Sequence, residues 1–248
     1  MASESSEPKT LVMLLDQSEA LKLIREQIGT TTTTSQSEPK TAVGVIPGAK
    51  KPPAKPLKPR PIWREHQLIG DSMMGRLASY LGHKVPYNRE IHSKQLGLIT
   101  HGQTTGRLIG TLHSANSPPL APKVIVMIGT NDIAHDTPIG KAISNMKRIL
   151  AFLSKRCKEV VVLTLPPVPA MEASFENLSK FNTFIKENSV LEHKNIKVVD
   201  MAVIFGASTE TVKLDLFEKT FKGSNKKDLM HWNQDGMKQV LDALKKVI

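Results

Sequence analysis

Two short stretches of the sequence contain residues that could together carry out nucleophilic catalysis. Gly70-Asp71-Ser72 follows an apolar pair and places a serine hydroxyl where a strand would turn into a helix. Asp228 and His231 stand three residues apart near the C-terminus. The imidazole of such a pair can take the proton of a serine hydroxyl, while the carboxylate fixes its tautomer. The alternative interpretation of the first stretch is a helix cap, a position that Asp and Ser often occupy.

A serine nucleophile also needs hydrogen-bond donors for the oxyanion that develops on its substrate. Asn131 stands shortly after the apolar run Val124–Ile128, so its side-chain amide could be such a donor. Gly106 is expected to open a helix, where its backbone N–H would have no intrahelical acceptor. The turn preference of Asn gives Asn131 a purely structural alternative.

A second Asp/His pair, Asp132 and His135, has the same spacing as Asp228 and His231. We favour the later pair as orienting acid and base. The earlier pair directly follows Asn131, and one short turn would then have to supply both the oxyanion donor and the base.

The elements that must position these residues alternate between strands and helices from about residue 62 onward. The first strand is expected to end at Leu68-Ile69. Four more strands are expected over Leu96–Thr100, Val124–Ile128, Val160–Leu165 and Ile196–Met201. Helices are expected over Met73–Leu81, Gly106–Leu112, Pro138–Arg156, Ala173–Asn188 and Asn233–Val247. The pattern predicts an α/β fold: a three-layer α/β/α sandwich with a five-stranded parallel sheet in the flavodoxin-like order 2-1-3-4-5. The polar run before Leu68 predicts an exposed start to the first strand.

The composition indicates one domain preceded by a separable N-terminal part. The chain has 248 residues, of which 40% are hydrophobic and 4% aromatic, which predicts an aliphatic core. We expect the domain to cover residues 62–248, after a disordered, basic, proline-rich linker over 30–61. Residues 1–29 form a candidate amphipathic helix, and its seven-residue apolar spacing predicts a homodimer through residues 10–28. A helix that packs on its own domain is the alternative.

Charge and cysteine content restrict the partners and the compartment. The net charge is +11, and residues 40–60 hold six basic and no acidic side chains. A basic domain with such a segment could bind nucleic acid or an anionic membrane, and lysines that only increase solubility are the alternative interpretation. The candidate nucleic-acid contacts in this segment are Lys50, Lys51, Lys55, Lys58 and Arg60. The low aromatic content argues against recognition by base stacking. Cys157, the one cysteine, excludes an intramolecular disulfide and is expected to be a small apolar side chain at a helix end. Without an apolar signal or a transmembrane run, we expect a cytoplasmic protein, and a nuclear location stays open.

The candidate residues stand in four segments that resemble the four blocks of the SGNH, or GDSL, hydrolases, in the family's order, across residues 62–248. The segments are Gly70-Asp71-Ser72, Gly106, Gly129-Thr130-Asn131-Asp132 and Asp228-Leu229-Met230-His231. The resemblance implies a serine esterase that acts on a small-molecule, lipid or sugar ester through an acyl-Ser72 intermediate. It implies His231 as base, Asp228 as its orienting acid, and an oxyanion hole of Ser72, Gly106 and Asn131. It implies no cofactor, and no Cys/His cluster has the spacing of a metal site.

The sequence departs from the family's pattern in its second block. Thr100-His101-Gly102 stands where members commonly have an Asn two residues before a glycine, and Arg107 replaces a frequent acidic residue. Within the same superfamily, the OSK domain of insect Oskar proteins binds RNA and lacks the catalytic residues, and some retrotransposon esterase domains follow a coiled coil. The alternative function is therefore an RNA-binding module with little or no hydrolase activity.

Overall fold

A computed structural model describes residues 61–208, 211–221 and 223–248 of the chain. The candidate helix over 1–29, the dimer contact through 10–28 and nearly all of the proline-rich linker lie outside the described residues. The same holds for the candidate nucleic-acid contacts at Lys50, Lys51, Lys55, Lys58 and Arg60. These expectations stay predictions.

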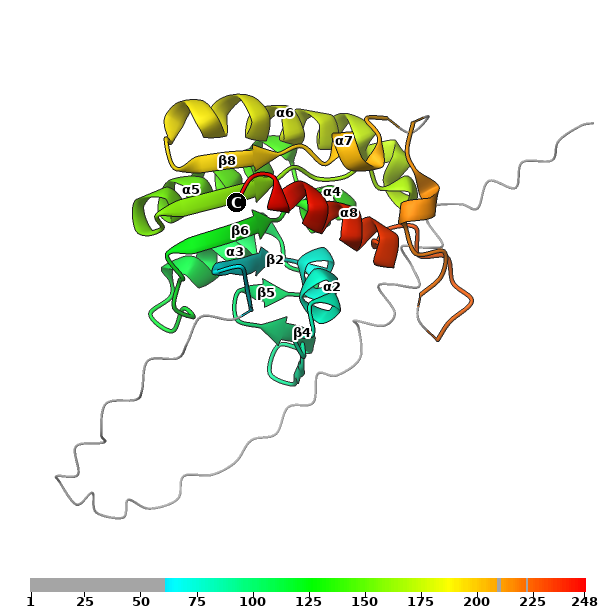
Figure 1. The fold of residues 1–248 in the computed structure, drawn as a ribbon, viewed down its shortest axis with the longest axis horizontal. Helices are drawn as coiled ribbons and strands as arrows, with labels where there is room; N and C mark the ends of the chain where they lie inside the picture. The colour runs from blue at the N-terminus through cyan, green and yellow to red at the C-terminus, as the bar shows by residue number, and fades with distance from the viewer. Residues whose placement is uncertain (1–60, 209–210, 222) are drawn as a thin grey trace, which may run out of the picture. The chain divides into compact units, whose positions relative to one another are not determined.

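The described residues form an α/β fold around a mixed, mostly parallel sheet of eight strands (Figure 1). Its parallel strands lie in the order β5-β2-β6-β7-β8, which corresponds to 2-1-3-4-5 along the chain. Their bounds are His66–Gly70 for β2, Ile99–Thr100 for β5, Lys123–Met127 for β6, Glu159–Leu163 for β7 and Ile196–Val199 for β8. The carboxyl ends of these strands meet at one edge of the sheet, which is the usual location of ligand sites in such folds.

The prediction of a purely parallel, five-stranded sheet is wrong, because antiparallel strands extend it. β1 (Ile62–Trp63) pairs with β2, and β3 (Tyr87–Asn88) pairs with β4 (Ser93–Leu96). β4 in turn pairs antiparallel with β5. The single strand expected over Leu96–Thr100 is thus a hairpin, because the chain reverses at Gly97, which has a φ of 60°.

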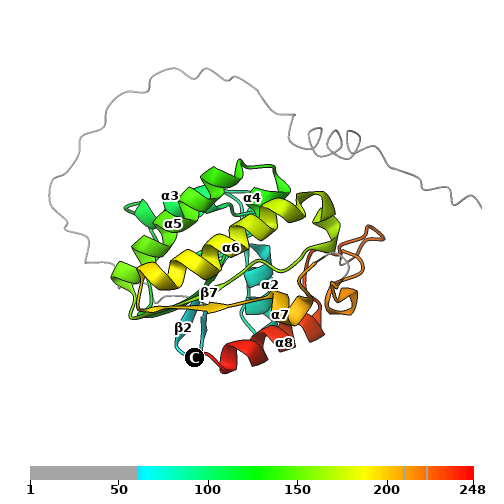
Figure 2. The same cartoon turned by 90° about the horizontal axis from the view of Figure 1, so that it is seen from above.

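Helices cover both faces of the sheet (Figure 2). One face carries α3 (Thr105–His113), α5 (Ile139–Arg156) and α6 (Phe175–Glu192), and the other carries α2 (Ser72–Tyr80), α7 (Ala202–Phe205) and α8 (Gln234–Lys245). The short helix α4 (Thr130–Ala134) follows β6. The structure also has 3-10 helices over Pro169–Ser174 and Leu214–Leu216. Among the described helices, none is long and apolar enough to cross a membrane.

The first parallel strand, β2, is buried along its whole length, so the expectation of an exposed start is wrong. β2 lies between β5 and β6, and its polar side chains are enclosed with it. The Gln67 side-chain oxygen accepts a hydrogen bond from the Ala121 N–H at 2.8 Å, and His66 Nδ1 lies 2.7 Å from the Arg64 carbonyl oxygen. These bonds offset part of the cost of burying polar groups.

Cys157 lies at the end of α5 and is buried, as expected for a small apolar side chain. Burial raises the pKa of its thiol to about 11, so the thiol stays protonated at neutral pH. A protonated, buried thiol is a poor nucleophile.

Candidate active site

Ser72 is the first residue of α2, directly after the turn that ends β2. Asp71 caps the helix, and its Oδ1 accepts the Met73 N–H at 3.0 Å. Gly70 has a φ of 152°, and a Cβ added there would clash with the Met127 carbonyl oxygen on β6. The N-cap of α2 is therefore Asp71, and Ser72 is not needed for that role. Asp71 satisfies the helix, while the Ser72 hydroxyl is left at the carboxyl edge of the sheet.

Ser72, His231 and Asp228 form one hydrogen-bonded chain. Ser72 Oγ lies 2.9 Å from His231 Nε2, although the two residues are 159 positions apart. His231 Nδ1 lies 2.8 Å and 3.0 Å from the two carboxylate oxygens of Asp228. This geometry fixes the imidazole with Nε2 toward the serine, as a general base requires.

The loop geometry of Asp228 explains why a spacing of three residues works. Its Oδ1 also accepts the backbone N–H groups of Met230 and His231, at 3.2 Å and 3.1 Å. Leu229, which lies between Asp228 and Met230, adopts a φ of 47°. The carboxylate thus folds the loop around itself and turns the histidine side chain toward it.

The earlier pair, Asp132 and His135, has a different role in the structure. The Asp132 carboxylate accepts the backbone N–H and the hydroxyl of Thr105, both at 2.7 Å. His135 ends α4 and is exposed. Asp132 therefore ties α4 to the start of α3, and the structure brings the later pair to Ser72.

The segment that carries Asp228 and His231 is a hairpin over residues 217–232, described except for residue 222, just before α8 (orange in Figure 1). Phe217 pairs with Trp232 at its base, and Thr220 pairs with Lys227 nearer its tip. Trp232 is fully buried and stacks on Phe205 at 5.6 Å between ring centroids. The base of the hairpin is thus fixed in the core.

Burial controls the charge of the groups around Ser72. It is the first cause that lowers the pKa of His231; Arg76 lowers it further, and the hydrogen bond with Asp228 opposes both. The imidazole is therefore held ready to accept a proton. Burial likewise lowers the pKa of His101 to about 4, with smaller effects from Lys94, His231 and Arg76. His101 is accordingly a neutral neighbour of the site.

Asn131 lies in the first turn of α4 and directs its amide toward the turn after β2. Its Nδ2 donates to the Gln103 carbonyl at 3.0 Å and lies 3.4 Å from Asp71 Oδ2. Gly106 is the second residue of α3, so its backbone N–H has no acceptor within its own helix, and the residue is exposed. The structure thus holds Asn131 close to the Ser72 turn.

Three neighbours of the site were not predicted as site residues, although His101 and Gly102 stand out in the sequence as part of a departure from the family's second block. Gly102 precedes the carbonyl that binds Asn131, has a φ of 72°, and faces open space where a Cβ would stand. His101 packs so closely on Gly75 that a Cβ there would meet its Nε2 at 2.5 Å. Arg76 donates to Asp228 Oδ2 at 2.9 Å. The available signals were the place of Gly102 just after a strand and the place of Arg76 one helical turn after Ser72.

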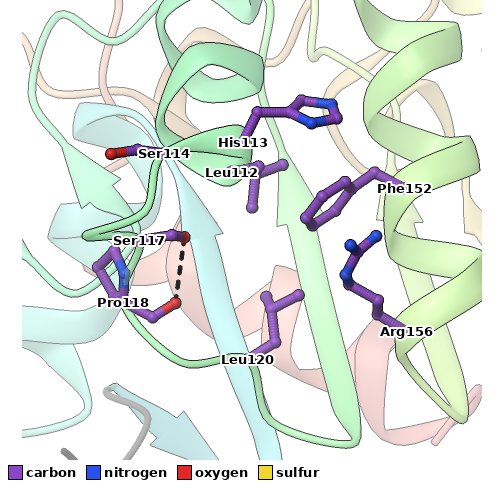
Figure 3. A pocket seen from close by; sticks show the side chains of 8 residues that line it. All are labelled: Leu112, His113, Ser114, Ser117, Pro118, Leu120, Phe152 and Arg156. Atoms are coloured by element: carbon purple, nitrogen blue, oxygen red, sulfur yellow. Dashed lines mark hydrogen bonds between the residues drawn. The ribbon is translucent and has the colours of Figure 1, made fainter.

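A cavity of about 360 Å³ lies elsewhere, where α3 and α5 end (Figure 3). The Arg156 guanidinium lies over the Phe152 ring at 3.9 Å, and His113 meets the same ring edge-on. Ser72, Asp228 and His231 do not line this cavity. Across the described residues, no group of three or more His, Cys, Asp or Glu side chains is arranged to hold a metal ion.

Comparisons with solved structures place the fold. The C-terminal domain of Drosophila Oskar matches with a TM-score of 0.62 at 21% identity, over 75% of this chain and 88% of that one. The OSK domain of Drosophila Oskar matches with a TM-score of 0.58 at 21% identity, over 74% and 88%. A GDSL-like lipase from Bacteroides thetaiotaomicron matches with a TM-score of 0.53 at 14% identity, over 77% and 93%. These similarities show that the chain has the fold that the resemblance to the SGNH hydrolases implies.

The family of the chain is identified from its sequence. A comparison with curated proteins found no match. The OSK domain family matches residues 55–248, which is most of the chain and includes every residue of the site described above. The chain therefore belongs to the OSK domain family.

Proposed function

We propose that the protein is a serine esterase that cleaves a carboxylic ester through an acyl-Ser72 intermediate. The observation that carries this proposal is the unbroken chain from Ser72 Oγ through His231 to the buried Asp228 carboxylate. A serine hydroxyl is a weak nucleophile, and an oriented neutral imidazole in contact with it is what activates it.

The reaction would run in two half-reactions. His231 Nε2 takes the Ser72 proton as Oγ attacks the ester carbonyl carbon, and the protonated imidazole then gives that proton to the departing alcohol. Water next attacks the acyl-serine with the same proton transfers in the same order, which releases the carboxylic acid and restores Ser72. Throughout, Asp228 stabilises the positive charge that forms on the imidazole.

The developing oxyanion would be bound at the edge of the sheet. The donors in this proposal are the backbone N–H groups of Ser72 and Gly106 and the amide of Asn131. Each such donor can contribute a few kcal/mol to the transition state (about 3 kcal/mol). Small-molecule, lipid and sugar esters are the substrate class that we propose.

Labelling with a fluorophosphonate probe tests the nucleophile, the base and the oxyanion hole together. We expect the full-length protein to be labelled, and Ser72→Ala and His231→Ala to lose both labelling and hydrolysis of p-nitrophenyl acetate, by about a thousandfold or more. Ser79→Ala is the matched control, because Ser79 lies on the same helix and its hydroxyl is bonded to the Gly75 carbonyl. A folded Ser72→Ala protein with wild-type turnover would exclude the proposal.

An RNA-binding role is the second candidate, and the hairpin over 217–232 favours it. Lys219, Lys226 and Lys227 are exposed on it, whereas its acidic side chains Glu218 and Asp228 both face Arg76. Among the described residues, no acidic side chain forms an ion pair with these lysines, so their positive charge is available to a partner. The basic linker before residue 61 and the membership of the OSK domain family agree with this role, and phosphate contacts dominate such binding.

A salt titration with a labelled single-stranded RNA tests this role. We expect binding that weakens steeply as the salt concentration rises. In Lys226→Glu/Lys227→Glu, the slope of the logarithm of the association constant against the logarithm of the salt concentration should become less negative by about two. Lys155→Glu/Lys158→Glu is the matched control, since both lysines are exposed where α5 ends and β7 begins. Absence of binding at low salt would remove this candidate and leave the esterase proposal untouched.

A further inference from the structure

Arg76 joins the helix that carries Ser72 to the hairpin that carries His231. Its Nη2 donates to Asp228 Oδ2 at 2.9 Å, and its Nη1 lies 3.6 Å from Glu218 Oε1. Arg76 and Asp228 are 152 positions apart in the sequence. One guanidinium thus grips both acidic residues of the hairpin from α2.

The contact completes the surroundings of a fully buried carboxylate. The Asp228 side chain has no exposed surface, and its Oδ1 is occupied by His231 and two backbone N–H groups. Arg76 occupies Oδ2. A buried charge needs such partners, and the planar fork of an arginine fixes the orientation of a carboxylate better than an ammonium does.

The same guanidinium opposes the positive charge that His231 acquires during turnover. The charged or titratable groups around His231 are Asp228 and Glu218 on the hairpin, Arg76 on α2, and His101 on the turn after β5. Asp228 and Glu218 raise the pKa of the imidazole and Arg76 lowers it, after the larger lowering by burial. His101 stays neutral, because its own pKa is lowered to about 4.

We propose that Arg76 is a positioning residue, which holds Asp228 in the orientation that His231 requires and places a positive charge beside the imidazole. This inference rests on the proposed esterase function. It assigns two separable effects to one side chain, because orientation depends on the fork of the guanidinium and proton affinity depends on its charge.

Kinetics of full-length Arg76→Lys and Arg76→Gln separate the two effects. Both variants lose the fork, so we expect kcat for p-nitrophenyl acetate to fall about tenfold or more in each. Arg76→Lys keeps the charge, so the acid limb of its kcat/KM profile should stay near the wild-type position. Arg76→Gln loses the charge, so its imidazole stays protonated to higher pH and the acid limb should move upward.

Glu218→Gln is a counterpart with the opposite sign. It removes a negative charge that raises the pKa of His231, so its acid limb should move to lower pH. Arg148→Gln, an exposed arginine on α5, is the control that should change neither kcat nor the profile. Glu218→Gln and Arg76→Lys also decide the matter if Arg76→Gln does not fold.

Two results would overturn the inference. The first is an acid limb that fails to move in folded Arg76→Gln, or in Glu218→Gln if the former does not fold. The second is full kcat in Arg76→Lys. If Arg76 and Glu218 only stabilised the fold, their substitution would lower the yield of folded protein. The kcat/KM profiles of Arg76→Gln and Glu218→Gln would then not move in opposite directions along the pH axis. Failure of the esterase proposal itself would be seen separately, as absence of labelling and turnover in the wild-type protein.

Discussion

Asn131, which we propose as an oxyanion donor, has a side chain that the fold already holds in one orientation. Its amide nitrogen is already directed toward the turn of Ser72 by the Gln103 carbonyl and by Asp71. A donor that is held in place loses little freedom when it binds a developing charge, and the oxyanion would replace the longer of its two contacts, the one with Asp71 at 3.4 Å. The partial exposure of Asn131 leaves it accessible to a substrate.

Replacement of this residue by alanine should slow the chemical step. We expect Asn131→Ala to lower kcat by about a hundredfold to a thousandfold with a smaller effect on KM, because the donor acts mainly on the transition state. Steady-state hydrolysis of p-nitrophenyl acetate measures both constants. Asn116→Ala, at an exposed turn, is the control. An unchanged kcat would remove Asn131 from the oxyanion hole.

At the scale of elements, the turn between β2 and α2 determines where the serine stands. Gly70 ends the strand with a φ of 152°, and a side chain there would meet the Met127 carbonyl and the Met74 side chain. β2 and β6 therefore approach each other at the carboxyl edge as closely as a glycine allows. This close approach sets the direction in which α2, and with it Ser72, leaves the sheet.

A pair of glycine substitutions tests this requirement. Gly70→Ala should lower the free energy of unfolding by about 2 kcal/mol or more, because a clash with backbone atoms is added to an unfavourable φ. Gly110→Ala should raise it by about 0.5–1 kcal/mol, since Gly110 lies within α3 with open space around it. Urea unfolding measures both. Equal stability of the two variants would mean that the turn tolerates a side chain.

At the scale of the whole molecule, the fold completely buries the carboxyl group of Asp71 at the carboxyl edge of the sheet. Asp71 has no exposed surface, and burial is the first cause that raises its pKa to about 7. The hydrogen bond from the Met73 N–H opposes this rise. The folded protein therefore binds a proton at Asp71 that the unfolded chain releases near pH 4, with its ordinary pKa of about 3.9.

The stability of the protein should accordingly fall as the pH rises from about 4 to about 7. The raised pKa gives a contribution that is fully present below the unfolded value and is lost through the folded value. Asp71→Asn cannot ionise but keeps the oxygen that accepts the Met73 N–H, so its stability should change less over this range. Urea unfolding of both proteins at pH 5 and pH 8 measures the difference. Parallel slopes would show that Asp71 is ionised in the folded state.

The sequence by itself determined the order and the extent of most elements. Apolar runs such as Val124–Ile128 and the helix-period pattern over Pro138–Arg156 correspond to β6 and α5 within one or two residues. The loop geometry of Asp228 and His231 also depends on hydrogen bonds over two or three residues, although the spacing alone does not distinguish this pair from Asp132 and His135. Such features follow from local contacts, which are written in neighbouring residues.

Only the tertiary structure decided the contacts between distant segments. The burial of His66 and Gln67 depends on the position of β2 inside the sheet, and the reversal at Gly97 depends on the pairing of β4 with β5. The grip of Arg76 on Asp228 crosses from one helix to a remote hairpin. These arrangements result from the packing of whole elements against one another, and no local pattern of residue types encodes which surfaces will meet.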